Sequence, residues 1–119
     1  MHLLAAALIA LTPGIRTPTG NISCFVSHQV LHCALRVADY RPRCRDLDWH
    51  GFELSTHGRA QVTCSGGILY DEKPRYSTLP YGRTWRVSAF TCVSRITGLT
   101  CTSGSGHGLF ISRQSWRGW

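Results

Sequence analysis

His107 stands between Gly106 and Gly108, and this setting makes it the side chain best suited to acid–base chemistry. An imidazole titrates near neutral pH, and the flanking glycines let a ligand approach it closely. Arg113 follows and can hold a carboxylate or phosphate through two parallel hydrogen bonds. Together they suggest a small hydrolase in which His107 is the general base and Arg113 orients an anionic substrate. In the structural alternative, His107 makes one hydrogen bond beside a strand bulge, and Arg113 caps carbonyls or pairs with an acid.

Other catalytic arrangements are weakly represented. The sequence has no G-x-S-x-G motif, which would mark a nucleophilic serine. A glycosidase needs two carboxylates; Asp46, Asp48 and Glu53 are candidates, but they lie in a polar stretch that we expect to be solvated. A cysteine nucleophile is excluded if all six cysteines are paired. The sequence therefore assigns no catalytic residue, no cofactor and no metal ligand.

Positive charge is the second chemical feature. Thirteen Lys and Arg against six Asp and Glu give a net charge of +7. Arg41, Arg43 and Arg45 recur at every second residue, so in an extended chain they share one face. Tyr81 and Trp85 add aromatic rings, and such a surface suits an anionic envelope polymer, an acidic glycan, a lipid headgroup or a protein. The alternative is that the arginines reflect coding bias alone. The chain lacks a nucleic-acid-binding motif, which argues against nucleic acid as a partner.

The six cysteines predict disulfides and not a zinc site, because none of their spacings is a C-x-x-C knuckle. Two segments share the layout Cys-x8-Cys. The even gap lets Cys24 face Cys33, and Cys92 face Cys101, across antiparallel hairpins. Cys44 and Cys64 then pair by elimination. Because this bridge closes the longest loop, we expect it to contribute more stability than the hairpin bridges.

The turns of the two hairpins differ in sequence. Residues 95–98 predict a four-residue loop in which Gly98 adopts the left-handed conformation. The equivalent residue of the first hairpin is Val30, which disfavours a positive φ. The first loop is therefore expected to be centred on His28 and Gln29, or to be irregular.

Residues 3–11 form an uncharged apolar run, which is too short for a bilayer core that requires about 20 residues. Thr12-Pro13-Gly14 follows, and the combination predicts a signal peptide at residues 1–14 and a single domain at residues 15–119. A buried N-terminal strand or helix is the alternative. Export agrees with the cysteine content, since disulfides persist in oxidising compartments. We expect a protein that is secreted or located in the cell envelope.

Alternating apolar and polar residues predict strands at residues 52–55, 60–63, 84–87 (continuing towards Phe90) and 109–111, the last of these being the final strand. Residues 21–41 also fit a helical stripe, which leaves a helix as an alternative there. The whole predicts an all-β domain of seven or eight short strands, arranged as a small disulfide-stapled antiparallel sandwich or barrel-like domain. The expected core comprises Ile22, Phe25, Leu35, Trp49, Phe52, Leu54, Val62, Trp85, Val87, Phe90, Leu99, Phe110 and Ile111.

Several motifs together resemble a known family. They are Thr17-Pro18-Thr19-Gly20-Asn21-Ile22-Ser23-Cys24 near the start, and Gly98-Leu99-Thr100-Cys101-Thr102 with Gly106-His107-Gly108-Leu109-Phe110-Ile111-Ser112-Arg113 near the end. The chain resembles small exported actinobacterial proteins of unknown function that have a TPSGNIxC start and a GVTCT…GHGFxxSR end. It departs from their pattern at Thr19, Val30 and Leu109. The resemblance implies secretion and a disulfide-bonded domain, and it brings no catalytic residues.

Taken together, the sequence favours a secreted or envelope-associated binding module whose ligand residues would come from His107, Arg113, Arg41, Arg43, Arg45, Tyr81 and Trp85. The alternatives are a small secreted hydrolase using His107 and a purely structural envelope protein. The sequence leaves the oligomeric state open.

Overall fold

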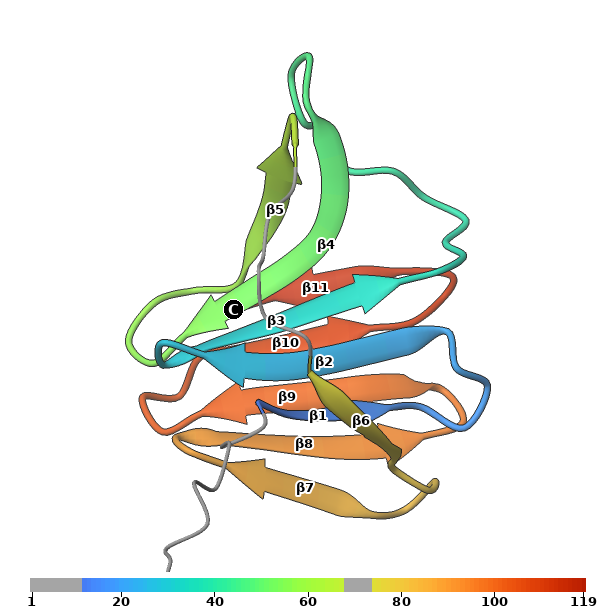
Figure 1. Ribbon diagram of the computed structural model, residues 1–119, viewed down its shortest axis with the longest axis vertical. Helices are drawn as coiled ribbons and strands as arrows, with labels where there is room; N and C mark the ends of the chain where they lie inside the picture. The colour runs from blue at the N-terminus through green and yellow to red at the C-terminus, as the bar shows by residue number, and fades with distance from the viewer. Residues whose placement is uncertain (1–11, 68–73) are drawn as a thin grey trace, which may run out of the picture.

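The computed structural model describes residues 12–67 and 74–119, in which all regular elements are strands (Figure 1). One sheet has six strands, in the spatial order β5 (Gln61–Ser65), β4 (Asp48–Ser55), β3 (Val30–Leu35), β2 (Ile22–Ser27), β1 (Pro13–Arg16) and β6 (Arg75–Thr78). The other has five, in the order β11 (Trp116–Gly118), β10 (Gly108–Ile111), β9 (Gly98–Ser103), β8 (Phe90–Arg95) and β7 (Thr84–Val87). The two sheets face one another. Because every regular element in the described residues is a strand, the all-β prediction is confirmed.

Strand pairing is antiparallel throughout these sheets, except that β1 runs parallel to β6. Eleven strands lie in the described residues, more than the seven or eight expected. The additional ones include β1, β6 and β11, which are short and carry little alternation. Leu109–Ile111 is a strand but not the final one, because β11 follows it. The described residues contain no helix, so the helical alternative at residues 21–41 is wrong; no helix long and apolar enough to cross a membrane is found there either.

Three turns show how the backbone connects the two strands of each hairpin. His28 and Gln29 both have positive φ, 51° and 62°, so the first hairpin turns at the expected place. In the second, Arg95 pairs with Gly98, so the loop is the dipeptide Ile96-Thr97 and not four residues. The alternation expected to run from residue 84 to Phe90 is broken by Ser88, whose φ of 53° makes a tight turn between β7 and β8.

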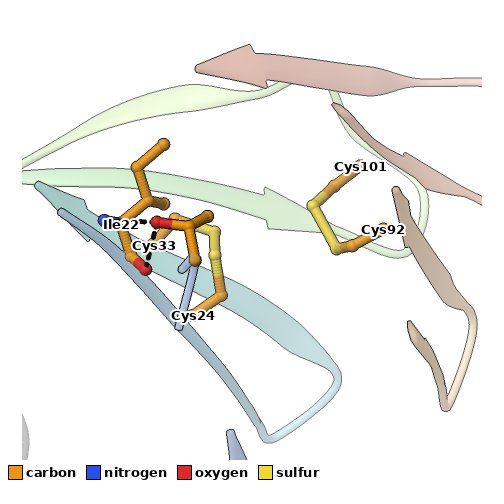
Figure 2. The surroundings of a disulfide bond; sticks show 6 residues. Ile22, Cys24, Cys33, Cys92 and Cys101 are labelled. Atoms are coloured by element: carbon orange, nitrogen blue, oxygen red, sulfur yellow. Dashed lines mark hydrogen bonds between the residues drawn. A yellow bond between two sulfur atoms is a disulfide. The ribbon is translucent and has the colours of Figure 1, made fainter. Parts of the chain in front are cut away.

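The interior is organised around two disulfides (Figure 2). Cys24–Cys33 joins β2 to β3 with a Cα–Cα distance of 4.1 Å, and Cys92–Cys101 joins β8 to β9 at 4.0 Å. Both are directly opposed pairs in their ladders. Cys44–Cys64 ties the connection between β3 and β4 to β5, so all three expected pairings are confirmed.

Side chains from both sheets pack around these bridges. Seven of the expected core residues are buried: Ile22, Phe25, Phe52, Leu54, Phe90, Leu99 and Ile111. Leu35, Trp49, Val62, Trp85, Val87 and Phe110 are only partly buried. The structure adds Ile15, Leu31, Leu79 and Leu109, which sequence reasoning had not placed in the core.

The connections divide between two ends of the sandwich (Figure 1). At the right-hand end of the view lie the β1–β2 connection, the end of β3, the β8–β9 turn, the β10–β11 connection and the start of β7. The β2–β3, β4–β5, β7–β8 and β9–β10 connections lie at the left-hand end. Residues far apart in sequence therefore meet at each end.

Candidate binding cleft

A cavity of about 320 Å³ opens at the end of the sandwich where the five right-hand segments just described meet. Each segment contributes to its wall: residues of the β1–β2 connection, the two residues after β3, Tyr81 before β7, the β8–β9 turn and the three residues after β10. We call this cavity the arginine cleft, because Arg36, Arg95 and Arg113 line it from three separate segments.

The three arginines leave an excess of positive charge in the cleft. Arg113 donates from Nε to Oδ1 of Asp39 at 3.2 Å, and this pair is solvent-exposed. No carboxylate of residues 12–67 or 74–119 forms an ion pair with Arg36 or Arg95. Two guanidinium groups are therefore available to an incoming anion.

Apolar side chains surround the same cleft. Val37 is 47% exposed, Tyr81 42% and Ile96 84%. They are three of the four large hydrophobic side chains that are exposed in the described part of the chain, the fourth being Leu47 at 49%. The cleft thus combines cationic and apolar groups within one small surface.

Asn21 fixes one wall of the cleft. Its side-chain oxygen accepts a hydrogen bond from the Val37 backbone N–H at 2.7 Å, and its amide nitrogen donates to the Val37 carbonyl at 3.0 Å. The Arg36 N–H donates to the Asn21 carbonyl at 2.9 Å. The side chain of Asn21 thereby continues the β2–β3 pairing beyond the ladder and holds Arg36 and Val37 in place.

The opposite wall is tied to the first sheet through Ser112 and Arg113. The Asp39 N–H donates to the Arg113 carbonyl at 2.8 Å, and the Tyr40 hydroxyl donates to the Ser112 carbonyl at 2.9 Å. Burial raises the pKa of Tyr40 to about 12, so this hydroxyl stays protonated and able to donate even at alkaline pH values at which an exposed tyrosine would ionise. The Ser112 hydroxyl accepts from the N–H groups of Gln114 and Ser115 and so shapes the turn that presents Arg113.

Tyr81 belongs to the segment of residues 79–82, which links the two sheets and which we call the strap. The Leu79 N–H donates to the Arg16 carbonyl at 2.9 Å, and the Leu79 side chain is buried. The Gly82 N–H donates to the Ser94 carbonyl at 2.7 Å, and the positive φ of Gly82, 82°, allows the chain to turn there. Tyr81 lies between these two anchors, so its ring is carried by fixed backbone on both sides.

The structure separates His107 from Arg113. His107 lies before β10 and Arg113 after it, so they occupy opposite ends of the sandwich. His107 Nδ1 lies 3.0 Å from the Trp119 carbonyl oxygen, within hydrogen-bond distance. Of the residues singled out from the sequence, Arg113 and Tyr81 line the cleft, whereas His107 does not. Trp85 lies on β7, opposite Cys92, and packs partly buried against the core.

The arginine stripe occupies a different region. Arg41, Arg43 and Arg45 are exposed in the connection between β3 and β4, which is not a strand, and Arg45 has a positive φ of 22°. None of them lines the arginine cleft. The alternation in sequence therefore does not produce a strand face.

The cysteine sulfurs form the one group of metal-ligand type found close together in the described residues. The Sγ atoms of Cys24, Cys33 and Cys101 lie within 4.8 Å of one another. Each is already bonded in a disulfide, so none offers the thiolate that a metal requires.

Sequence reasoning missed Arg36, Val37, Arg95 and Ile96 as residues of the cleft. Arg36 and Val37 follow an ordinary strand and carry no motif. The one available signal was Ile96, since an isoleucine in a two-residue hairpin turn is unusual where polar residues and glycine dominate.

Comparisons with known proteins identify the family but no function. The chain belongs to DUF6636, a family of unknown function, whose model matches residues 21–117. That range contains all six cysteines and the three arginines of the cleft. No curated protein matches the chain. No solved structure matches it either.

Proposed function

We propose that this DUF6636 protein is a secreted or cell-envelope binding module that holds an anionic group in the arginine cleft. The three disulfides support a place outside the cytoplasm, because reducing compartments keep thiols free. The predicted signal peptide at residues 1–14 agrees with this, although it lies largely outside the described residues. The ligand is a carboxylate- or phosphate-bearing component of the envelope or the medium.

One observation carries the proposal: three arginines from three separate segments line one cavity, and two of them lack an ion-pair partner among the described residues. Maintaining several like charges near each other costs free energy unless an anion is bound. Thr17, Thr19 and Gln114 add neutral hydrogen-bonding groups to the wall. The volume, about 320 Å³, is at the lower end of that of small-ligand sites.

The composition of the cleft favours binding over hydrolysis. Among the described residues, those that line the cleft include no histidine, carboxylate or cysteine, so they supply no general base of the usual types. His107, the candidate base, lies at the other end of the sandwich. A hydrolase that combines His107 with Arg113 is therefore not supported by the geometry.

The test is a titration of the protein with inorganic phosphate, followed by amide chemical shifts in NMR spectra. We expect shifts at Thr97, Gly98 and Gln114, and we expect Arg95→Gln to abolish them. Arg86→Gln is the matched control, because Arg86 is an exposed arginine of β7 outside the cleft. Equal effects of the two substitutions, or shifts confined to residues 41–45, would refute the proposal.

A further inference from the structure

The arginine cleft has an apolar margin that a site for a small soluble anion does not require. Ile96 occupies the tip of the β8–β9 hairpin and is 84% exposed, so it contributes almost nothing to the core. Single exposed apolar residues are ordinary on protein surfaces. Here, however, Val37, Tyr81 and Ile96 border the same cavity, and only Leu47 among the exposed large hydrophobics of the described residues lies elsewhere.

We propose that the arginine cleft docks on an anionic phospholipid membrane: the guanidinium groups bind a headgroup phosphate, and Val37, Tyr81 and Ile96 enter the interfacial region of the bilayer. This inference rests on the proposed function, since it names the source of the anion. It adds a surface that the binding of a soluble anion would leave unused.

Charge complementarity supports this partner. Arg36, Arg95 and Arg113 line the same cleft, and the only ion pair that they form within residues 12–67 and 74–119 is the exposed one between Arg113 and Asp39. Each basic residue close to an anionic bilayer is attracted to its negative surface potential. The net charge of +7 adds longer-range attraction to the same surface.

The apolar side chains suit the interface in kind as well as in position. Tyr81 has an apolar ring and a polar hydroxyl, a combination enriched at the level of lipid headgroups. Ile96 and Val37 are purely apolar and would gain free energy on leaving water. Arginine side chains can lay their methylene stems along the apolar region while the charged end remains at the phosphate.

The backbone around the cleft is suited to such docking because it is already ordered. Asn21 holds Val37 with two hydrogen bonds, and the anchors of Leu79 and Gly82 hold the strap that carries Tyr81. Ile96 lies in a two-residue turn closed by the pair Arg95 and Gly98. Little backbone conformational entropy would be lost when this surface contacts a membrane.

The test is co-sedimentation of the protein with vesicles of phosphatidylcholine alone and with vesicles that also contain phosphatidylglycerol. We expect binding only to the anionic vesicles, weakened as salt is added. Ile96→Ser and Arg95→Gln should each reduce the affinity roughly tenfold. Ile96 is too exposed for its replacement to disturb the core, and thermal melting of each variant verifies that it is folded.

Two matched controls locate the surface. Leu47→Ser removes the one exposed large hydrophobic that lies outside the cleft, and Arg86→Gln removes an arginine outside it. Neither should change the affinity for vesicles. If Leu47→Ser weakens binding as much as Ile96→Ser, the connection that carries Arg41, Arg43 and Arg45 is the docking surface and the inference is wrong. If Ile96→Ser has no effect while Arg95→Gln does, attraction is purely electrostatic and apolar insertion is refuted.

The titration with inorganic phosphate separates this inference from the proposed function. Phosphate shifts in the cleft without vesicle binding would leave the proposed function standing and overturn the membrane partner. The absence of both would overturn both. Vesicle binding that free glycerol phosphate displaces, together with sensitivity to Ile96→Ser, would support the inference.

Discussion

The sulfur of Cys101 on β9 lies within 4.8 Å of the sulfur of Cys33 on β3, although the two belong to different disulfides in facing sheets. The hairpin bridges therefore pack against each other as the centre of the core. All four of their cysteines are buried, whereas Cys44 and Cys64 are only partly so. Because of this difference in burial, we expect the hairpin disulfides to contribute more stability than Cys44–Cys64, which is the reverse of the order that loop length alone predicts.

We expect the double substitution of Cys92 and Cys101 by alanine to cost more stability than that of Cys44 and Cys64. Chain entropy assigns about 3 kcal/mol to either loop. Deleting two buried sulfurs adds a cavity and a loss of apolar burial of about 1 kcal/mol for each atom. Urea unfolding of the two variants under oxidising conditions measures the difference, and a larger loss for the Cys44–Cys64 pair would show that loop length dominates.

Asn21 should contribute to stability by holding the backbone of Val37 in place. Replacing Asn21 with alanine removes two hydrogen bonds and should cost about 1–2 kcal/mol in the free energy of unfolding. Asn21→Asp keeps the acceptor for the Val37 N–H but loses the donor to its carbonyl, so its loss should be intermediate. Chemical denaturation ranks the three proteins, and equal stability of all three would contradict the assigned role.

Gly51 should tolerate no side chain. It sits at an irregularity in the β4–β5 ladder with a φ of 111°, and a Cβ there would meet the carbonyl oxygen of Cys33. Gly51→Ala should therefore cost at least about 2 kcal/mol. Gly67→Ala is the control, because a Cβ at Gly67 would meet nothing within 4 Å and its cost should stay within about 0.5 kcal/mol. Comparable melting temperatures for the two variants would contradict the structure.

Tyr40 should make the stability fall at alkaline pH. Its pKa is about 12 in the folded protein against 10.0 when unperturbed, so between these values the unfolded chain loses the proton and the folded one keeps it. The unfolded state is then favoured, and the contribution of Tyr40 is complete below pH 10 and lost as the pH rises through 12. Burial also raises the pKa of Tyr76, with Arg16 opposing the shift, so the wild type alone does not isolate Tyr40. The difference in unfolding free energy between wild type and Tyr40→Phe, followed from neutral to alkaline pH, should shrink in this window; a constant difference would refute the assignment.

If the protein is exported, as we propose, we expect cleavage before Thr12 and not after Gly14. Pro13 and Gly14 are part of β1, and the Arg75 N–H donates to the Thr12 carbonyl at 3.1 Å. Gly14 is buried against Tyr76, where a Cβ would lie 2.8 Å from the ring. Cleavage after Gly14 would remove these contacts. Intact mass spectrometry of the protein recovered from the medium identifies the first residue. An N-terminus at Ile15 would contradict this prediction and show that the first residues of β1 are dispensable.

The sequence predicted the two hairpin disulfides, the strand class and the His28–Gln29 turn because each depends on residues close together in the chain; Cys44–Cys64 then followed by elimination. The even spacing of Cys24 and Cys33 determines a hairpin with local information alone. The pairing of β1 with β6 could not be predicted in this way. It joins two four-residue strands, one of which begins with proline, and neither shows a clear alternation.

The cleft could not be predicted because it arises where connections from both sheets meet. Arg36 and Arg95 look like any other exposed arginines until the strand order brings their segments to one end. The reverse holds for His107 and Arg113, which are close in sequence but not in space. Because β10 is extended between them, they are placed at opposite ends.

The parallel pairing of β1 with β6 determines when the six-stranded sheet can be completed during folding. When the chain is synthesised, β1 can pair with β2 almost at once. The strand on its other side, β6, follows only after β3, β4 and β5 in the sequence. Until then one edge of β1 has open backbone groups, in the manner of an edge strand exposed to other chains. During synthesis the free edge of β1 can therefore pair with the wrong strand. This risk ends when Arg75–Thr78 is available and pairs with β1.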